Sequence, residues 1–146
     1  MSELKNQISQ YIDTNAKVYQ DISLAIHAKP EVSDFEYFAS QALSEQLKKE
    51  GFEIELPAAG HRTGFAATYK SNKPGPTVVF LAEYDALAGL GHGCGHNVFG
   101  TTSSLAGAAL KSVVDRIGGE VRVYGTPGEE GAQNGSANGA FVKQGY

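Results

Sequence analysis

The chain of 146 residues is long enough for one domain with a hydrophobic core, and its 41% hydrophobic and 19% charged residues are typical of a globular protein. A net charge of −4 at pH 7, without a basic run or a long apolar run, argues against a protein that binds nucleic acid or a membrane. The N-terminus lacks a signal-peptide core, and the single cysteine cannot form an internal disulfide, so we expect a cytoplasmic protein.

The first predicted element is a long helix. Apolar residues recur at helical spacing from Leu4 to Ile26, Ser2 is placed to cap the helix, and Pro30 is placed to end it. A second helix is predicted over residues 35–47, which carry an apolar face at the same spacing.

The ends of the second helix also carry recognisable signals. Ser33 and Glu36 have the spacing of a capping box, in which each side chain accepts a hydrogen bond from the other residue's free amide. Gly51 is well placed to end the helix, since glycine adopts the left-handed conformation that often follows a last turn.

Four strands are predicted. Residues 52–56 alternate between apolar side chains and glutamates, which indicates a half-exposed strand, and residues 64–70 form a second candidate. Residues 77–82 are a continuous apolar run, as expected of a strand buried on both faces. Residues 120–125 form the next strand after a pair of glycines.

Two helices complete the predicted elements. Residues 97–117 are rich in Gly, Ala, Ser and Thr, which favours a helix packed closely on a sheet, and a short helix is expected over residues 135–143. The strand at 77–82, the helix at 97–117 and the strand at 120–125 make a βαβ unit with parallel strands. The sequence therefore predicts an α/β fold.

Side chains with metal-binding or catalytic chemistry follow both strands of the βαβ unit. Parallel strands end at the same edge of a sheet, where ligands of such folds bind, so we expect these side chains to share one cleft. After the first strand and then after the second, they are Asp85, His92, Cys94, His96, Glu129 and Glu130.

This combination of side chains favours a metal site. A thiolate, imidazoles and carboxylates together suit Zn²⁺, with Mn²⁺ or Co²⁺ as alternatives. Of the adjacent Glu129 and Glu130, one can bind the metal while the other acts as general base, and the spacing does not decide which. Asp85 is placed to accept a hydrogen bond from a ligand histidine and to orient it.

An alternative is a cysteine hydrolase with Cys94 as nucleophile and His96 or His92 as base. Two residues of separation give a poor geometry for such a pair, and this hypothesis leaves the two glutamates without a role. A nucleotide-binding loop is disfavoured because the third glycine of G-x-G-x-x-G is missing and no Gly-Lys-Ser/Thr follows.

Four segments together resemble one known family. They are I-H-A-K-P-E at 26–31, A-E-Y-D-A-L at 82–87, G-C-G-H-N at 93–97 and T-P-G-E-E-G at 126–131. The combination is similar to the metal-dependent aminoacylase/carboxypeptidase superfamily. It is most similar to the amidohydrolase branch, which contains N-acyl-amino-acid, indole-acetyl-amino-acid and aminobenzoyl-glutamate hydrolases.

The resemblance implies a three-layer αβα fold with a mixed, partly parallel sheet, like the catalytic domain of zinc peptidases. It implies two divalent metal ions, Zn or Mn, and hydrolysis of an amide bond in an N-acyl amino acid or small peptide. Cys94, His96 and Glu130 match metal ligands, Glu129 matches the general base and Asp85 the orienting aspartate. The residue after His96 is asparagine here, whereas aspartate is commoner in the family.

Members of this family are far longer than 146 residues. The resemblance therefore implies that residues 1–146 form the N-terminal portion of the catalytic domain, and that the lid or dimerisation domain and the C-terminal catalytic portion are absent. We expect an incomplete metal site with little or no hydrolase activity. The alternative is a truncated, catalytically incompetent fragment that binds metal, and the chain could form homo-oligomers.

Overall fold

A computed structural model describes residues 3–146, so the predicted cap at Ser2 lies outside the described residues. The described chain folds into helices and strands in the order α1 (Glu3–Ala28), α2 (Tyr37–Lys49), β1 (Glu53–Glu55), β2 (Phe65–Lys70), β3 (Thr77–Ala82), α3 (His96–Ile117), β4 (Glu120–Gly125) and α4 (Ala137–Gln144). Among these residues, no helix combines the length and the apolarity that crossing a membrane requires.

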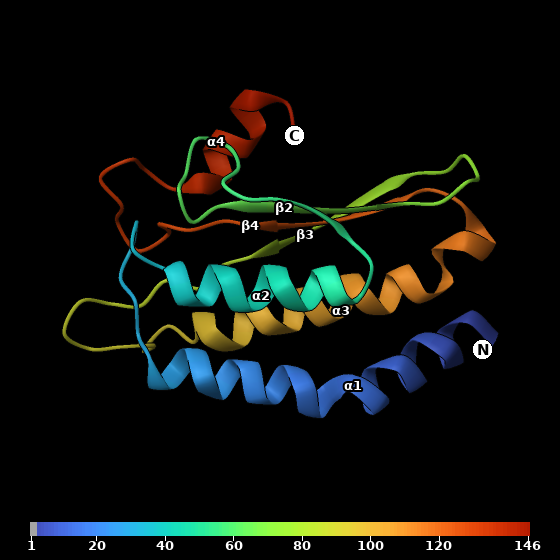
Figure 1. Cartoon of the computed structure of the whole chain (residues 1–146), viewed down its shortest axis with the longest axis horizontal. Helices are drawn as coiled ribbons and strands as arrows, with labels where there is room; N and C mark the ends of the chain where they lie inside the picture. The colour runs from blue at the N-terminus through green and yellow to red at the C-terminus, as the bar shows by residue number, and fades with distance from the viewer. Residues whose placement is uncertain (1–2) are drawn as a thin grey trace.

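The strands form one sheet in the order β1-β2-β4-β3. β1 pairs antiparallel with β2 and β2 with β4, whereas β3 and β4 are parallel and are connected through α3. Helices α2 and α3 cover one face of the sheet, α1 packs beyond α3, and α4 lies on the opposite face (Figure 1). The predicted three-layer α/β fold with a mixed sheet is confirmed.

The prediction that β3 is buried on both faces is wrong. β3 lies at the edge of the sheet, and its side chains Val78, Val79 and Leu81 are 39–43% exposed. A continuous apolar run predicts a strand, but it does not determine how many neighbours the strand has. Here β4 is the one strand of the described chain that pairs with β3.

The start of α2 also differs from the prediction. The helix begins at Tyr37, and no side chain of its N-cap residue, Glu36, caps it. Instead, the two carboxylate oxygens of Glu31 accept hydrogen bonds from the amides of Phe38 and Ala39, each at 3.0 Å. The Ser33–Glu36 capping box is therefore wrong, because Glu31 satisfies the free amides and leaves Glu36 to turn into the protein.

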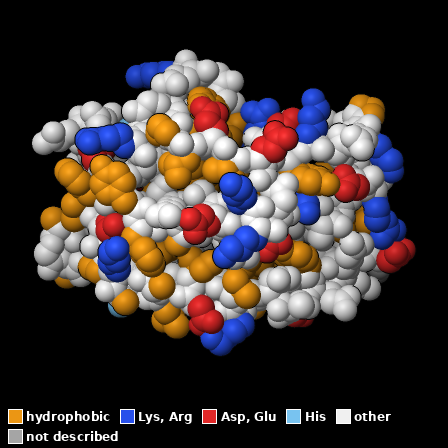
Figure 2. All heavy atoms as spheres, viewed as in Figure 1, with side chains coloured by type: hydrophobic (Ala, Val, Ile, Leu, Met, Phe, Trp, Pro, Cys, Tyr) orange, Lys and Arg blue, Asp and Glu red, His pale blue; other side chains and the backbone are white. Residues whose placement is uncertain are grey.

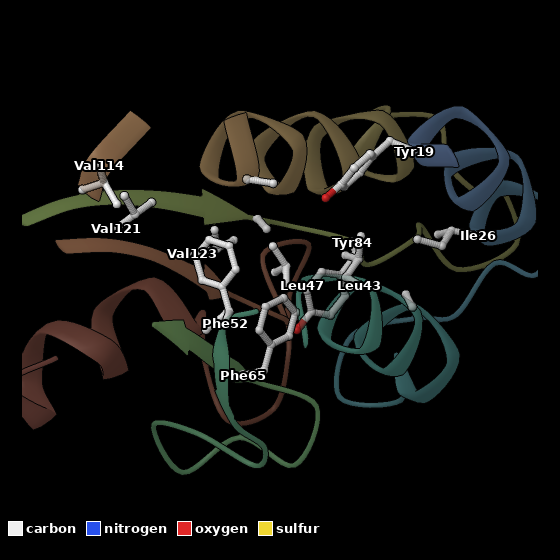
Figure 3. Packing of buried hydrophobic residues seen from close by; sticks show 14 residues of the cluster. Tyr19, Ile26, Leu43, Leu47, Phe52, Phe65, Tyr84, Val114, Val121 and Val123 are labelled. Carbon is white, nitrogen blue, oxygen red and sulfur yellow. The ribbon is translucent and has the colours of Figure 1, made fainter. Parts of the chain in front are cut away.

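The main core lies between the sheet and the helices that cover it. Leu43 and Leu47 of α2 are fully buried and pack with Phe52, Phe65 and other apolar side chains (Figure 3). A second, smaller cluster joins α4 to the other face of the sheet through stacked rings of Tyr124 and Phe141. On the surface that Figure 2 shows, acidic and basic side chains are interspersed.

Glycines let α3 approach the sheet closely, as its small-residue composition predicts. A Cβ atom on Gly107 would lie 2.4 Å from Cγ2 of Val123, and one on Gly100 would lie 2.6 Å from the backbone oxygen of Glu83. The second contact is the more restrictive, because a backbone oxygen cannot rotate away. Gly100 thus fixes the distance between α3 and the segment that follows β3.

We expect Gly100→Ala to lower the free energy of unfolding by about 1–3 kcal/mol, because overpacking forces a backbone shift. Chemical denaturation measures this change. Gly139→Ala is the matched control, since Gly139 is a helical glycine with no atom within 4 Å of an added Cβ, and alanine there gains up to about 1 kcal/mol in helix propensity. Equal stability of both variants would contradict the close approach at Gly100.

Candidate metal centre

The site is formed by the segments that follow β3 and β4. The two strands are in register to their last residues, where Ala82 pairs with Gly125, so both segments leave the sheet at the same edge. The amide of Thr126 donates to the carbonyl of Ala82 at 2.9 Å and holds the two exits together. Figure 1 shows both loops at one end of the sheet, on the left of the view.

His96 lies at the centre of this edge, as the first residue of α3. Its imidazole is largely buried, and Nδ1 lies 2.9 Å from Oδ1 of Asp85 and 3.1 Å from the Asp85 carbonyl oxygen. Both oxygens accept only, so Nδ1 carries the proton in this contact. Nε2 is then an unprotonated nitrogen, which is the form that binds a metal.

Three carboxylates surround His96 Nε2. Oε2 of Glu83 lies 3.4 Å away, Oε2 of Glu129 3.7 Å and Oε1 of Glu130 3.8 Å. One oxygen of Glu83, one of Glu129 and a ring nitrogen of His96 all lie within 4.8 Å of one another. This arrangement concentrates negative charge around a neutral nitrogen, which favours a bound divalent cation.

Asp85 connects the two loops beneath this cluster. Its side chain is fully buried, and besides the His96 contact its Oδ2 accepts hydrogen bonds from Ser33 Oγ and from the Glu130 amide, each at 2.8 Å. Asp85 thus contacts His96 as the sequence predicts. Its role in orienting a metal ligand stays a prediction.

Comparison with known proteins identifies relatives over nearly the whole chain. One of the subunits of the p-aminobenzoyl-glutamate hydrolase of Escherichia coli is 34% identical over 164 aligned residues, which cover 99% of this chain and 33% of that protein. The Xaa-Arg dipeptidase of Mus musculus is 35% identical over 144 aligned residues, which cover 87% of this chain and 32% of that protein. No family model matches the chain.

The chain belongs to the aminoacylase and carboxypeptidase superfamily. The crystal structure of a dinuclear metal-binding M20-family peptidase from Bacillus subtilis shares the fold, with a TM-score of 0.71 and 24% identity, and the match covers 91% of this chain and 40% of that one. The chain spans about a third of the length of the curated relatives it matches.

Within the superfamily site, Cys94 is placed differently from the other predicted ligands. It is exposed and lies outside the group formed by Glu83, His96 and Glu129. A hydrogen bond to the Glu130 carboxylate raises the pKa of the Cys94 thiol, and the nearby carboxylates add to this effect. Nucleophilic cysteines need a lowered pKa, so this environment disfavours the cysteine hydrolase alternative.

His92 and Glu83 both differ from what the sequence pattern predicts. His92 turns away from the carboxylates, and its ring stacks on His27 at a centroid distance of 6.2 Å. Glu83 is not among the predicted site residues, yet it lies closest of the three carboxylates to His96 Nε2, and it accepts a hydrogen bond from Asn138 Nδ2 at 3.1 Å. Its position one residue after a strand that ends at the site was the available signal.

The residues present fit a divalent metal. A separation of 3.4 Å, as between Glu83 Oε2 and His96 Nε2, suits two ligands of one tetrahedral ion, since each ligand lies about 2 Å from the metal. Imidazole and carboxylate ligands suit both Zn²⁺ and Mn²⁺. The hydrogen bond to Asp85 supplies the outer contact that metal-binding histidines usually make.

Proposed function

We propose that this chain carries the general base and part of the metal site of an amidohydrolase that acts on N-acyl amino acids or small peptides. The observation that carries this proposal is His96, whose Nε2 faces three carboxylates while Nδ1 is bound to Asp85. The E. coli and mouse relatives, named as a hydrolase of p-aminobenzoyl-glutamate and a dipeptidase, support this substrate class.

In the proposed reaction, Glu129 is the general base. Its side chain is 42% exposed, so both water and a substrate can reach it, and its carboxylate lies near His96. Glu129 accepts a proton from the attacking water and then passes it to the leaving amine nitrogen. A bound divalent ion supplies Lewis acidity, which activates the water and polarises the amide carbonyl.

His96, Glu130 and Cys94 are proposed as ligands from the family match, and Glu83 is proposed from its position beside His96. The Bacillus neighbour, which is named as dinuclear, supports two ions, either Zn or Mn, in the complete unit. We propose that the rest of the catalytic domain and a lid domain lie outside these 146 residues. A cytoplasmic location and homo-oligomers belong to the same proposal.

A second candidate is a metal-binding fragment without catalytic activity. It is favoured by the match to only 33% and 32% of the lengths of the two relatives. The two candidates share the metal site and differ in whether further ligands complete it. Amide hydrolysis by the 146-residue chain distinguishes them.

The first test is a titration of the purified chain with Zn²⁺ and Mn²⁺, followed by elemental analysis, beside a Cys94→Ala variant. We expect the chain to bind metal and the variant to bind it about 10-fold or more weakly, because a ligand is lost. A folded chain that binds neither ion would contradict the proposed site. Robust hydrolysis of p-aminobenzoyl-glutamate or N-acetyl amino acids by the chain alone would contradict its incompleteness.

A further inference from the structure

Glu36 is a fully buried carboxylate that the proposed reaction does not use. Its exposed fraction is 0%, and its contacts are hydrogen bonds rather than an ion pair: Oε2 accepts from Thr63 Oγ1 at 2.7 Å, and Oε1 accepts from the Gly128 amide at 3.0 Å. Burial raises the pKa of Glu36, which reflects the cost of removing a charged carboxylate from water. The two hydrogen bonds offset that cost.

The bond to Gly128 lies directly before the two catalytic glutamates. Gly128 is held by Glu36, and Glu130 is held through its own amide by Asp85 at 2.8 Å. Glu129 lies between these two fixed points, so the direction in which its side chain leaves the backbone is set from both sides. The loop contains few other constraints at this point, since Glu129 itself is exposed.

The bond to Thr63 leads to the other loop of the site. The backbone oxygen of Thr63 accepts a hydrogen bond from the hydroxyl of Tyr84 at 2.5 Å, and Tyr84 is fully buried between Glu83 and Asp85 in the chain. Glu36 is therefore connected at one oxygen to the loop after β4, and at the other, through Thr63, to the loop after β3.

We propose that Glu36 is a positioning residue, which holds the two site loops at the spacing that metal binding by His96 and its carboxylates requires. This inference rests on the proposed function. It assigns Glu36 no contact with metal or substrate. What matters is the acceptor oxygen facing Gly128, and not the negative charge.

This distinction makes the inference testable by substitution. In Glu36→Gln, the amide oxygen can still accept from Gly128, and the amide nitrogen can donate to Thr63, whose hydroxyl both donates and accepts. Glu36→Met keeps a similar volume but removes both acceptors. Thr63→Val removes the Thr63 hydroxyl and leaves the Glu36–Gly128 bond in place, so it is the matched control for lost stability.

The experiment measures amide hydrogen exchange at Gly128 and Zn²⁺ affinity in the 146-residue chain and these variants. We expect Glu36→Met to exchange about 10- to 100-fold faster at Gly128, as the loss of a hydrogen bond to a charged group predicts. We also expect its Zn²⁺ affinity to fall about 10-fold, as for other outer contacts of a metal site. Glu36→Gln should stay near the parent in both, and Thr63→Val should keep the protection of Gly128.

Unchanged exchange at Gly128 in Glu36→Met, or faster exchange with unchanged Zn²⁺ affinity, would overturn the inference. Equal losses in Glu36→Gln and Glu36→Met would also overturn it, since the charge would then be what matters. If Glu36→Met does not fold, Glu36→Asp replaces it, because a shorter side chain cannot reach Gly128 and Thr63 together. If the parent chain binds no Zn²⁺, the proposed function fails, and the exchange at Gly128 alone decides whether Glu36 holds the loop.

Discussion

Replacing His96 by alanine is expected to abolish stoichiometric metal binding. Nε2 is the one neutral donor among the described residues of the cluster, and three carboxylates alone would gather mutually repelling charges without the nitrogen that Zn²⁺ prefers. Loss of an outer contact already costs about 10–100-fold in affinity, so loss of the ligand itself should exceed that range. Isothermal titration with Zn²⁺ and elemental analysis measure the change.

His27→Ala is the matched control for His96→Ala. It removes an exposed imidazole that stacks on His92 and is not part of the carboxylate group, so we expect metal affinity to stay near that of the parent. Circular dichroism of both variants establishes whether the fold is retained. Stoichiometric Zn²⁺ in a folded His96→Ala chain would show that the metal binds elsewhere.

Asp85→Ala is expected to destabilise the protein as well as the metal site. Among the donors that lose their acceptor, the His96 ring nitrogen and the Glu130 amide are held by the backbone and cannot easily rotate to another partner. Each buried donor left without an acceptor costs about 1–3 kcal/mol, so we expect the free energy of unfolding to fall by about 2–5 kcal/mol. Urea denaturation and Zn²⁺ titration together measure both effects.

Asp13→Ala is a suitable comparison, because Asp13 is an exposed aspartate of α1 and its replacement should change stability by no more than about 0.5 kcal/mol. Asp85→Asn gives a finer measurement, since asparagine keeps one acceptor oxygen and can satisfy either His96 or Glu130 but not both. Its stability should fall between that of the parent and that of Asp85→Ala. If Asp85→Ala is as stable as Asp13→Ala, Asp85 does not hold the two loops together.

Much of the site can be predicted from the sequence because topology acts over long separations. Residues 77–82 and 120–125 are recognisable as strands around a helix, and a parallel pair brings their ends to one edge however many residues intervene. His96 and Glu129, which are 33 residues apart in the numbering, are therefore neighbours for a reason that local pattern supplies. The motif residues then add the chemistry.

Other features depend on tertiary contacts that local pattern does not encode. Glu31 and Glu36 both lie near the start of α2, and spacing alone favours Glu36 as the capping residue, whereas the structure uses Glu31 and buries Glu36 against Thr63 and Gly128. Thr63 and Gly128 lie 27 and 92 residues away from Glu36, so no short-range signal connects them. The exposure of β3 is similar, since the order of strands in the sheet decides it.

The position of β3 at the edge determines where the sheet can grow. Its outer backbone groups have no strand beside them in the described chain, and the run from Thr77 to Ala82 contains no proline and no charge to discourage pairing. A strand added there in parallel would end next to Glu83, beside His96. Extension of the sheet and completion of the metal centre are thus the same geometric event: a polypeptide that docks along β3 delivers its next side chains directly to the carboxylates.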